Sequence, residues 1–476
     1  MANGSLSAPV VPLEAGEPDP QGARGGKERA VDEWTVTGNM EDALTSQNVL
    51  TKQARIAELA QKLIGRQLHA LNHYLDMDWM QEACRKTRKD GAPGVDGMTW
   101  EEYSRDLNAR LNDLLNRAKA GDPYRAPAVR RTYIPKGKHE TRPLGIPTLE
   151  DKILQRAVTM VLEPIYEQEF LDCSHGFRPG RSPHQALQVI WRQVMSTGGC
   201  WLIDADISKF FDTLDKAVLR GLVHQRVGDG VIRRLIGKWL SAGVLEKGVL
   251  TYPETGTPQG GVISPMLSNI YLHHVLDLWF ERDIKPRLKG RAWMVRFADD
   301  FIIGFEREDD ARRVYEVLFK RFEKHGLRIH PDKTRLVPFF PPERNGGERV
   351  TFNFLGFTHS WGTSRKGRAY VQRQTMSKRL TRALDGLRQY CRKARTEPLV
   401  CQWEGLKRKM RGHYAYYGIT GNRRQLASYA HETKRIWRFW LNRRSSKRDM
   451  PWDRFNRVLV RFPLPPPRIV HSVFAQ

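Results

Sequence analysis

The chain has 476 residues, with 79 Lys and Arg against 53 Asp and Glu, which gives a formal net charge of +26. Such an excess indicates a polyanionic partner, nucleic acid before an anionic membrane surface. No apolar run approaches the length of a membrane span, about 18 residues, and the first residues lack the basic and apolar segments of a signal peptide.

The five cysteines are scattered and odd in number. They form no pair at zinc-ligand spacing, and they argue against a disulfide framework. We therefore expect a reducing, cytoplasmic location.

Residues 1–45 are rich in Gly, Pro, Ala and charge without periodicity, which predicts a disordered leader. From Ser46 apolar residues recur at helical spacing, and further helices are predicted around Trp79 and from Trp100 to Ala118. A Gly/Pro loop at 89–97 separates these last two helices.

Two basic loops follow. In 133–147, Lys136 and Arg142 could both reach a phosphate group, although an ordinary exposed hairpin is the simpler alternative. After a helix predicted from Leu149 to Glu167, the Gly-rich loop 175–182 carries Arg178 and Arg181 and precedes another helix. A loop at a helix start can hold phosphate or a nucleic-acid backbone.

Residues 201–207 predict a strand that is buried on one face and ends in carboxylates. Asp204 and Asp206 share one face of it. An unpaired charge within an apolar run is costly, so Asp206 needs a cation or a basic partner. The alternative is a core strand with a charged end.

The loop 257–265 contains Gln259 beside two glycines, which allow a ligand backbone to approach closely, although a plain Gly-rich turn also fits. A helix is predicted after it, from Met266 to about Leu276. Residues 294–305 then predict a β-hairpin with Asp299 and Asp300 at its tip. Adjacent carboxylates repel, and hard oxygen ligands suit Mg²⁺, whereas a solvated acidic turn is the alternative. A helix over 309–325 and a strand over 351–358 complete this region.

Three carboxylates on two strands, a Gly-rich loop and upstream basic loops fit two-metal phosphoryl transfer. Asp206 precedes Asp299 by 93 positions, which is compatible with neighbouring strands of one sheet.

The C-terminal region carries most of the net positive charge, +18 of +26, because residues 378–476 hold 24 Lys and Arg against 6 Asp and Glu. Three apolar stripes at helical spacing predict three helices. The basic side chains there are candidates for phosphate contacts; they are Lys407, Arg408, Lys409, Arg411, Arg423 and Arg424. The tyrosines at 414, 416 and 417 could stack on unpaired bases or, alternatively, pack in the helical core.

In order, the segments KGKHETRPLGIP, HGFRPGRSPHQAL, DADISKFFDTLD, GTPQGGVISPMLSNIYL, RFADDFIIGF, HPDKT and FNFLGF resemble those of bacterial group II intron reverse transcriptases/maturases over about 46–444. The resemblance implies an α+β, right-hand polymerase. Its fingers would span 46–195 and its palm 196–365, with an antiparallel sheet carrying the catalytic Asp residues. A helical thumb/maturase domain at 376–445 and a short basic tail at 446–476 would follow.

The resemblance also assigns roles to single residues. Asp206, Asp299 and Asp300 match the catalytic triad that binds two Mg²⁺ ions, together with the carbonyl of Ile207. Further matches concern the incoming nucleotide: Lys136 and Arg142 at the triphosphate, Gln259 beside the nucleotide, and Phe211 as the ring that excludes a 2′-hydroxyl. Phe297 stands where the family usually has tyrosine.

The implied function is RNA-directed DNA synthesis combined with binding of group II intron RNA in splicing and mobility. The implied partners are an RNA template with a DNA primer, dNTPs, intron RNA and target DNA in the bacterial cytoplasm or at the nucleoid. The roughly 30 residues after Arg444 contain no CxxC pair, so we expect no endonuclease domain. The alternatives are a maturase with a vestigial polymerase and another bacterial reverse transcriptase, of the defence or diversity-generating kind.

Overall fold

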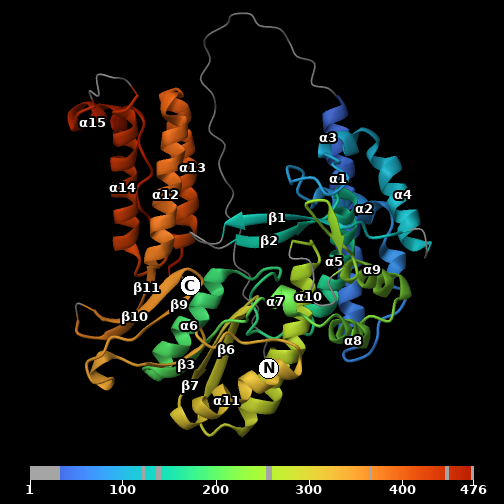
Figure 1. Ribbon diagram of the computed structural model, residues 1–476, viewed down its shortest axis with the longest axis horizontal. Coiled ribbons are helices and arrows are strands. Elements are labelled where there is room, and N and C mark those ends of the chain that lie inside the picture. Colours follow the sequence, from blue (N-terminus) through green and yellow to red (C-terminus); the bar gives the residue numbers. More distant parts are fainter. Residues whose placement is uncertain are drawn as a thin grey trace, which may run out of the picture.

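The computed structural model describes residues 33–120, 124–135, 141–252, 260–364, 366–444 and 450–472, with side chains described from residue 43. Within these ranges helices and strands are mixed and three sheets form, so the predicted α+β class is confirmed (Figure 1). No helix in this part of the chain is long and apolar enough to cross a membrane. Single 3₁₀ turns lie at Leu71–Tyr74, Ser104–Asp106, Lys285–Arg287, Pro342–Arg344 and Ala394–Thr396.

The N-terminal half is largely helical. Its helices are α1 (Glu33–Lys62), α2 (Met77–Arg85), α3 (Trp100–Tyr103), α4 (Leu107–Lys119), α5 (Leu149–Tyr166), α8 (Lys216–Arg226) and α9 (Gly230–Leu240). Helix α5 is the central one, since 13 of its 18 residues are buried, and it ends one residue before the predicted boundary. Helix α1 starts 13 residues earlier than expected, because the stretch 33–45 contains one glycine and no proline to interrupt it.

A four-stranded N-terminal sheet lies beside these helices. Its order is β2 (Thr141–Ile146), β1 (Val129–Pro135), β4 (Val244–Glu246), β5 (Val249–Thr251). Strands β1 and β2 are antiparallel and pair Ile134 with Arg142, whereas β1 and β4 are parallel. Arg142 therefore sits at the end of the hairpin where the predicted basic loop begins.

The central sheet is antiparallel throughout. Its order is β6 (Ala292–Phe297), β7 (Asp300–Phe305), β3 (Cys200–Ala205), β8 (Arg335–Phe339). Ala205 pairs with Phe301, so the end of β3 and the tip of the β6–β7 hairpin meet at one edge of the sheet. The short helix α7 (Phe210–Thr213) follows β3 at this edge.

Both faces of the central sheet are buried, and not only one as expected. Ile203 and Phe301 belong to the large core that includes α11 (Glu308–Lys324). Leu202 and Ile302 belong to a second core that includes α6 (Pro183–Thr197). Because successive side chains of a strand point to opposite faces, two adjacent apolar residues on each strand serve two cores.

A third sheet contains β9 (Thr351–Phe354), β10 (Phe357–Thr363) and β11 (Ala369–Thr375). The single strand predicted over 351–358 is wrong, because the chain reverses at Leu355 and Gly356. Both residues have positive φ, 48° and 81°, which is the signature of a two-residue type I′ hairpin turn. The turn was missed because leucine is unusual in that conformation.

Helix α10 (Ser264–Leu272) does not end near Leu276 as predicted. It continues through two wider, π-helical segments, His273–Asp277 and Trp279–Ile284. Such insertions change which side chains face a neighbour and are frequent at functional sites. Here they accompany a buried carboxylate at Asp277.

The C-terminal region is a bundle of α12 (Ser377–Lys393), α13 (Leu399–Tyr417), α14 (Arg423–Leu441) and α15 (Trp452–Arg461) (Figure 1). The three predicted apolar stripes meet in one core, with Leu387, Met410 and Tyr429 buried. At the base of the bundle the Asn422 side chain accepts from the Thr375 amide at 2.9 Å and donates to Thr375 Oγ1 at 2.8 Å.

The segment after residue 450, expected as a tail, is folded onto the bundle. Phe455 of α15 is fully buried, and the chain then returns to the base of the bundle. There the His471 amide donates to the Gly418 carbonyl at 2.8 Å. The imidazole of His471 also stacks on that of His184 on α6, with centroids 3.5 Å apart.

His359 yields a pH prediction. Its ring lies flat against Phe352 and is fully buried, and neither ring nitrogen has a hydrogen-bond partner among the described residues. Burial, followed by the nearby Arg373 charge, lowers the pKa of His359 to about 3. Because the unfolded chain takes up this proton below about pH 6.5 and the folded chain does not, the imidazole costs stability as the pH falls.

We expect His359→Phe to raise the melting temperature relative to the parent by more at pH 5 than at pH 7. Thermal unfolding at both pH values measures this difference. His431→Phe, at an exposed position of α14, is the control. An effect of H359F that does not change with pH would contradict the prediction.

Candidate active site

The β6–β7 hairpin turns through only two residues, Ala298 and Asp299, and confirms the predicted acidic tip. Phe297 pairs with Asp300 across it. Ala298 has a φ of 58°, a left-handed conformation that glycine usually supplies at this position of a hairpin turn. For an L-residue it costs about 1–2 kcal/mol, so the surroundings must impose the turn.

A loop between α5 and α6 presses against this turn. The Arg296 amide donates to the Cys173 carbonyl at 2.7 Å, and the His175 amide donates to the Arg296 carbonyl at 2.8 Å. A Cβ atom on Gly176 would lie 2.3 Å from the Ala298 amide nitrogen. Only glycine fits there, and the loop therefore fixes the backbone of the hairpin.

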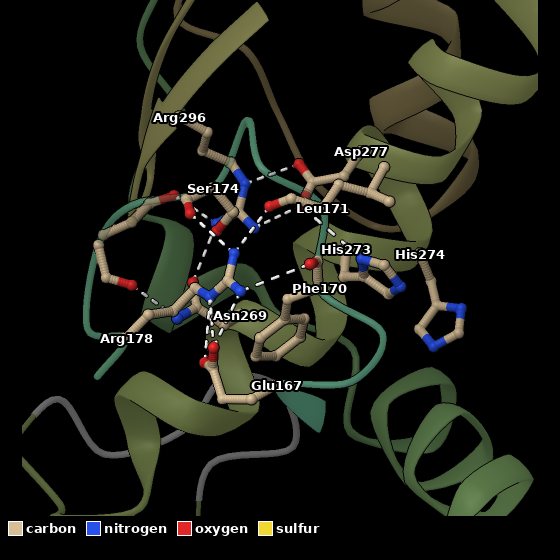
Figure 2. Close-up of polar contacts among 12 residues, drawn as sticks. Glu167, Phe170, Leu171, Ser174, Arg178, Asn269, His273, His274, Asp277 and Arg296 are labelled. Carbon is tan, nitrogen blue, oxygen red and sulfur yellow. Dashed lines mark hydrogen bonds and ion pairs between the residues drawn. The ribbon is translucent and has the colours of Figure 1, made fainter. Parts of the chain in front are cut away.

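The Arg296 side chain lies beneath the turn, completely closed to solvent (Figure 2). It donates to the carboxylate of Asp277 at 2.8 and 2.5 Å, to Asn269 Oδ1 at 2.9 Å and to the Ala298 carbonyl at 3.0 Å. Burial opposes the charged guanidinium, but Asp277 outweighs it and raises the pKa of Arg296. Sequence reasoning missed this residue, although a lone arginine inside an apolar strand is a signal of a buried ion pair.

Asp206 follows β3 directly and reaches the same edge. Its amide donates to Thr334 Oγ1 at 3.3 Å, and its carbonyl accepts from the His330 amide at 2.8 Å. The pairing of Ala205 with Phe301 places it next to the start of β7. The three predicted carboxylates thus lie at one edge of the central sheet.

Two of these carboxyls, those of Asp299 and Asp300, have a raised pKa. Asp300 is accessible to solvent, yet desolvation by the surrounding protein and then repulsion from Asp299, Asp206 and Asp204 raise the pKa of its carboxyl to about 7. Desolvation also raises the pKa of Asp299, while the charge of Arg142 on β2 acts in the opposite direction. Negative charge is therefore concentrated here beyond what nearby cations neutralise.

Two basic residues from the segment before and within β8 meet the acidic edge. Lys333 Nζ lies 3.0 Å from Asp206 Oδ2, and an Arg335 nitrogen lies 3.1 Å from Asp204 Oδ2. In the described part of the chain no three acidic, His or Cys side chains converge as a ready-made metal cage. The donor set nevertheless fits a hard divalent cation, because it contains only carboxylate oxygens whose repulsion such an ion would relieve.

Comparison with known proteins decides the family. Residues 134–359 match the family model described as reverse transcriptase (RNA-dependent DNA polymerase). The chain is also 34% identical over 318 residues to the Escherichia coli protein YkfC, covering 59% of this chain and 79% of that protein. The chain belongs to the reverse transcriptase family.

Two further relatives of this reverse transcriptase are named for introns. It is 42% identical over 186 residues to the group II intron-encoded protein LtrA of Lactococcus lactis, covering 38% of this chain and 31% of LtrA. It is 43% identical over 241 residues to an uncharacterized 91 kDa protein in the cob intron of Schizosaccharomyces pombe, covering 50% of this chain and 29% of that protein. The chain thus spans about a third of the length of these two relatives.

Of the residues expected at the nucleotide, Lys136 and Gln259 lie outside the described residues. Arg142 is exposed at the start of β2. The loop that carried Gln259 does approach this strand, since a Cβ atom on Gly260 would lie 2.6 Å from the Gly145 carbonyl oxygen. In the reverse transcriptase, Gly260 at the described end of the Gly-rich loop therefore lies against Gly145 of β2.

Two phenylalanines lie near the acidic edge of the reverse transcriptase. Phe211 on α7 is half-buried, edge-on to Phe210 with centroids 5.3 Å apart. Phe297, in the position usually held by tyrosine, is half-buried and lies 6.5 Å from the exposed ring of Phe177.

Arg178 is not on the nucleic-acid surface where it was expected. Its side chain is 3% exposed, pairs with Glu167 at 2.9 Å and donates to the carbonyls of Leu171 and Ser174 at 2.7 and 2.9 Å (Figure 2). It stabilises the loop behind the hairpin and has no accessible face for phosphate. Arg181 is half-buried and pairs with Asp172 at 2.5 Å.

The basic residues predicted on the bundle are mostly exposed. Those in solvent are Arg408, Lys409, Arg411, Arg423 and Arg424, whereas Lys407 is half-buried with its amine over the ring of Trp403. The neighbouring tyrosines are packing residues: Tyr414 is buried, and the Tyr416 hydroxyl donates to the Leu355 carbonyl at 2.9 Å. Base stacking by these tyrosines is therefore not supported.

The raised pKa of Asp300 predicts the direction in which stability changes with pH. Since the folded protein holds this proton up to about pH 7 and the unfolded chain releases it near pH 4, the carboxyl lowers stability as the pH rises through that window. We expect Asp300→Asn to raise the melting temperature of the metal-free protein in chelator at pH 8, and to change it little at pH 4.

Asp385→Asn, at an exposed position of α12, is the matched control. A lower melting temperature for D300N at pH 8 would show that the charged Asp300 carboxylate does not destabilise the metal-free protein.

Proposed function

We propose that the protein is an RNA-directed DNA polymerase that copies an RNA template from a DNA primer and also binds group II intron RNA. The observation that carries this proposal is the meeting of Asp206, Asp299 and Asp300 at one sheet edge, with the charge of Arg142 acting on Asp299. Membership of the reverse transcriptase family supports the reaction.

The fold supports a right-hand arrangement of domains. The helical N-terminal half with its sheet would form the fingers, residues 46–195 with further elements. The central and third sheets would form the palm, 196–365, and the helical bundle would form the thumb or maturase domain, 376–445. In support, charges from both sides act on the acidic edge. Arg142 of the N-terminal hairpin acts on Asp299, and Arg379 at the start of α12 partly opposes the rise in the pKa of Asp300.

Asp206, Asp299, Asp300 and the Ile207 carbonyl would hold two Mg²⁺ ions. Bound there, these ions supply activation of the primer 3′-hydroxyl and neutralisation of the leaving pyrophosphate. The protein's own part is to bring the carboxylates together on a rigid sheet edge. Lys333, whose Nζ lies 3.0 Å from Asp206 Oδ2, would compete with a metal ion for that carboxylate.

On the nucleotide side, Arg142 and Lys136 would bind the triphosphate from the basic loop, and Gln259 would lie beside the incoming nucleotide. The half-buried ring of Phe211 would exclude a ribose 2′-hydroxyl and favour dNTPs. Its position on the short helix that follows Asp206 supports this role, because that helix starts at the acidic edge.

The bundle would bind intron RNA through backbone phosphates. The candidate side chains are exposed, and none forms an ion pair with a carboxylate among the described residues. They are Arg408, Lys409 and Arg411 on α13 and Arg423 and Arg424 on α14. The relatedness to an intron-encoded protein supports intron RNA as partner, with roles in splicing and, with target DNA, in mobility.

A second candidate is a splicing maturase whose polymerase is vestigial. The retained carboxylates favour an active polymerase over it. A defence or diversity-generating reverse transcriptase is less well supported, because two of the similar proteins are associated with introns.

We expect Asp299→Ala to abolish cDNA synthesis, because it removes a carboxylate from the proposed metal site, and to leave RNA binding intact. Primer extension on poly(rA)/oligo(dT) with Mg²⁺, beside RNA binding, measures both. Asp90→Ala, a largely exposed carboxylate in the N-terminal half, serves as control. Absence of dNTP incorporation by the parent itself would leave the splicing-only alternative.

The triple variant R408Q/K409Q/R411Q should weaken RNA binding and flatten its salt dependence. If each residue contacts one phosphate, the slope of log K against log[salt] falls by about 2, at roughly 0.7 per contact on single strands. The control R312Q/K320Q/K324Q removes exposed charges from α11, away from the bundle (Figure 1). Equal effects of the two variants would indicate non-specific attraction.

A further inference from the structure

We propose that Arg296, Asp277 and Asn269 form a positioning network that sets the place of the Asp299 carboxylate in the reverse transcriptase reaction. None of these three side chains is expected to contact substrate, since all are fully buried. The proposal rests on the proposed polymerase function and concerns how one of its catalytic side chains is aimed.

The network joins strand β6 to α10 and its π-helical continuation, 19 to 27 residues earlier in the chain (Figure 2). Asp277 comes from the π-helical continuation of α10, Asn269 from α10 itself, and Arg296 from β6. Asn269 Nδ2 also donates to the Gly176 carbonyl at 2.8 Å, and Gly176 is the glycine whose missing Cβ leaves room for Ala298. Arg296 and the loop at Gly176 thus both hold the turn at Ala298.

The contact that matters for positioning is the one from Arg296 Nη1 to the Ala298 carbonyl, at 3.0 Å. That carbonyl belongs to the residue with φ of 58°, directly before Asp299. An alanine adopts this conformation only when its surroundings over-determine it. The planar guanidinium can bind Asp277, Asn269 and the turn at once, which a lysine cannot.

A buried ion pair by itself is weak evidence for stability, because the desolvation of both charges offsets their attraction. The pair would therefore be dispensable for folding if both partners were replaced by apolar residues of similar volume. It would not be dispensable for aiming Asp299, because a displacement of about 1 Å in a catalytic group can cost roughly 100-fold in rate.

The test compares the double variant R296M/D277L with a matched control, R226M/E169L. The control removes a second ion pair, between the buried Arg226 of α8 and the half-buried Glu169, in which Arg226 also donates to the Ala60 carbonyl at 2.6 Å. Three quantities are measured: the melting temperature, Mn²⁺ binding without nucleic acid by electron paramagnetic resonance, and steady-state primer extension.

We expect both double variants to melt near the parent. R296M/D277L should bind Mn²⁺ about 10-fold more weakly and show kcat lowered by about 10- to 100-fold, with KM for dNTP changed little. The control should match the parent in Mn²⁺ binding and kcat. Parent-like Mn²⁺ binding and kcat in a folded R296M/D277L would overturn the proposal and reduce the network to a structural element.

If R296M/D277L does not fold, Arg296→Lys decides the question, because it keeps a cation against Asp277 and loses the contact with the turn. A folded R296K with parent Mn²⁺ affinity and kcat would then overturn the proposal, and loss of both would support it. If the parent protein binds Mn²⁺ but does not extend a primer, the polymerase function is refuted. The difference in Mn²⁺ binding between the parent and R296M/D277L would still test the positioning network.

Discussion

The ion pair between Arg296 and Asp277 is the interaction on which the acidic edge depends. Both groups are closed to water, so each is tolerable only while the other is present. The pair ties a strand of the central sheet to the extension of α10, and its remaining donors reach Asn269 and the turn. A second buried arginine, Arg178, braces the loop on the other side. The acidic edge is thereby built on two buried arginines, Arg296 and Arg178.

Much of this site was predictable from sequence. The acidic pair between two apolar runs predicted the β6–β7 hairpin. Asp206, at the end of an apolar run, predicted the neighbouring strand β3. Local pattern failed where the outcome depended on tertiary burial. Arginines in a Gly-rich loop predict phosphate binding equally well whether or not they are buried, so Arg178 was misplaced. A leucine at positive φ concealed the hairpin at Leu355, because only the packing of the third sheet makes that conformation tolerable.

The acidic edge shows how stability and chemistry oppose each other in this protein. Carboxylates are gathered where the surrounding protein disfavours their charge, and the described cations beside them, Lys333 and Arg335, each pair with a different carboxylate. For Asp300 the opposing charge of Arg379 is outweighed by desolvation and by repulsion from the other carboxylates. The rigid central sheet, packed between its two cores, holds these side chains together despite that repulsion.

The base of the C-terminal bundle has a further consequence. Three separate stretches fasten it to the rest of the molecule: the link from β11 into α12, the turn where Asn422 meets Thr375, and the returning segment at His471. These contacts gather at the end of the bundle where α13 gives way to α14. The position of the α13 basic side chains relative to the acidic edge therefore depends on the packing at this junction.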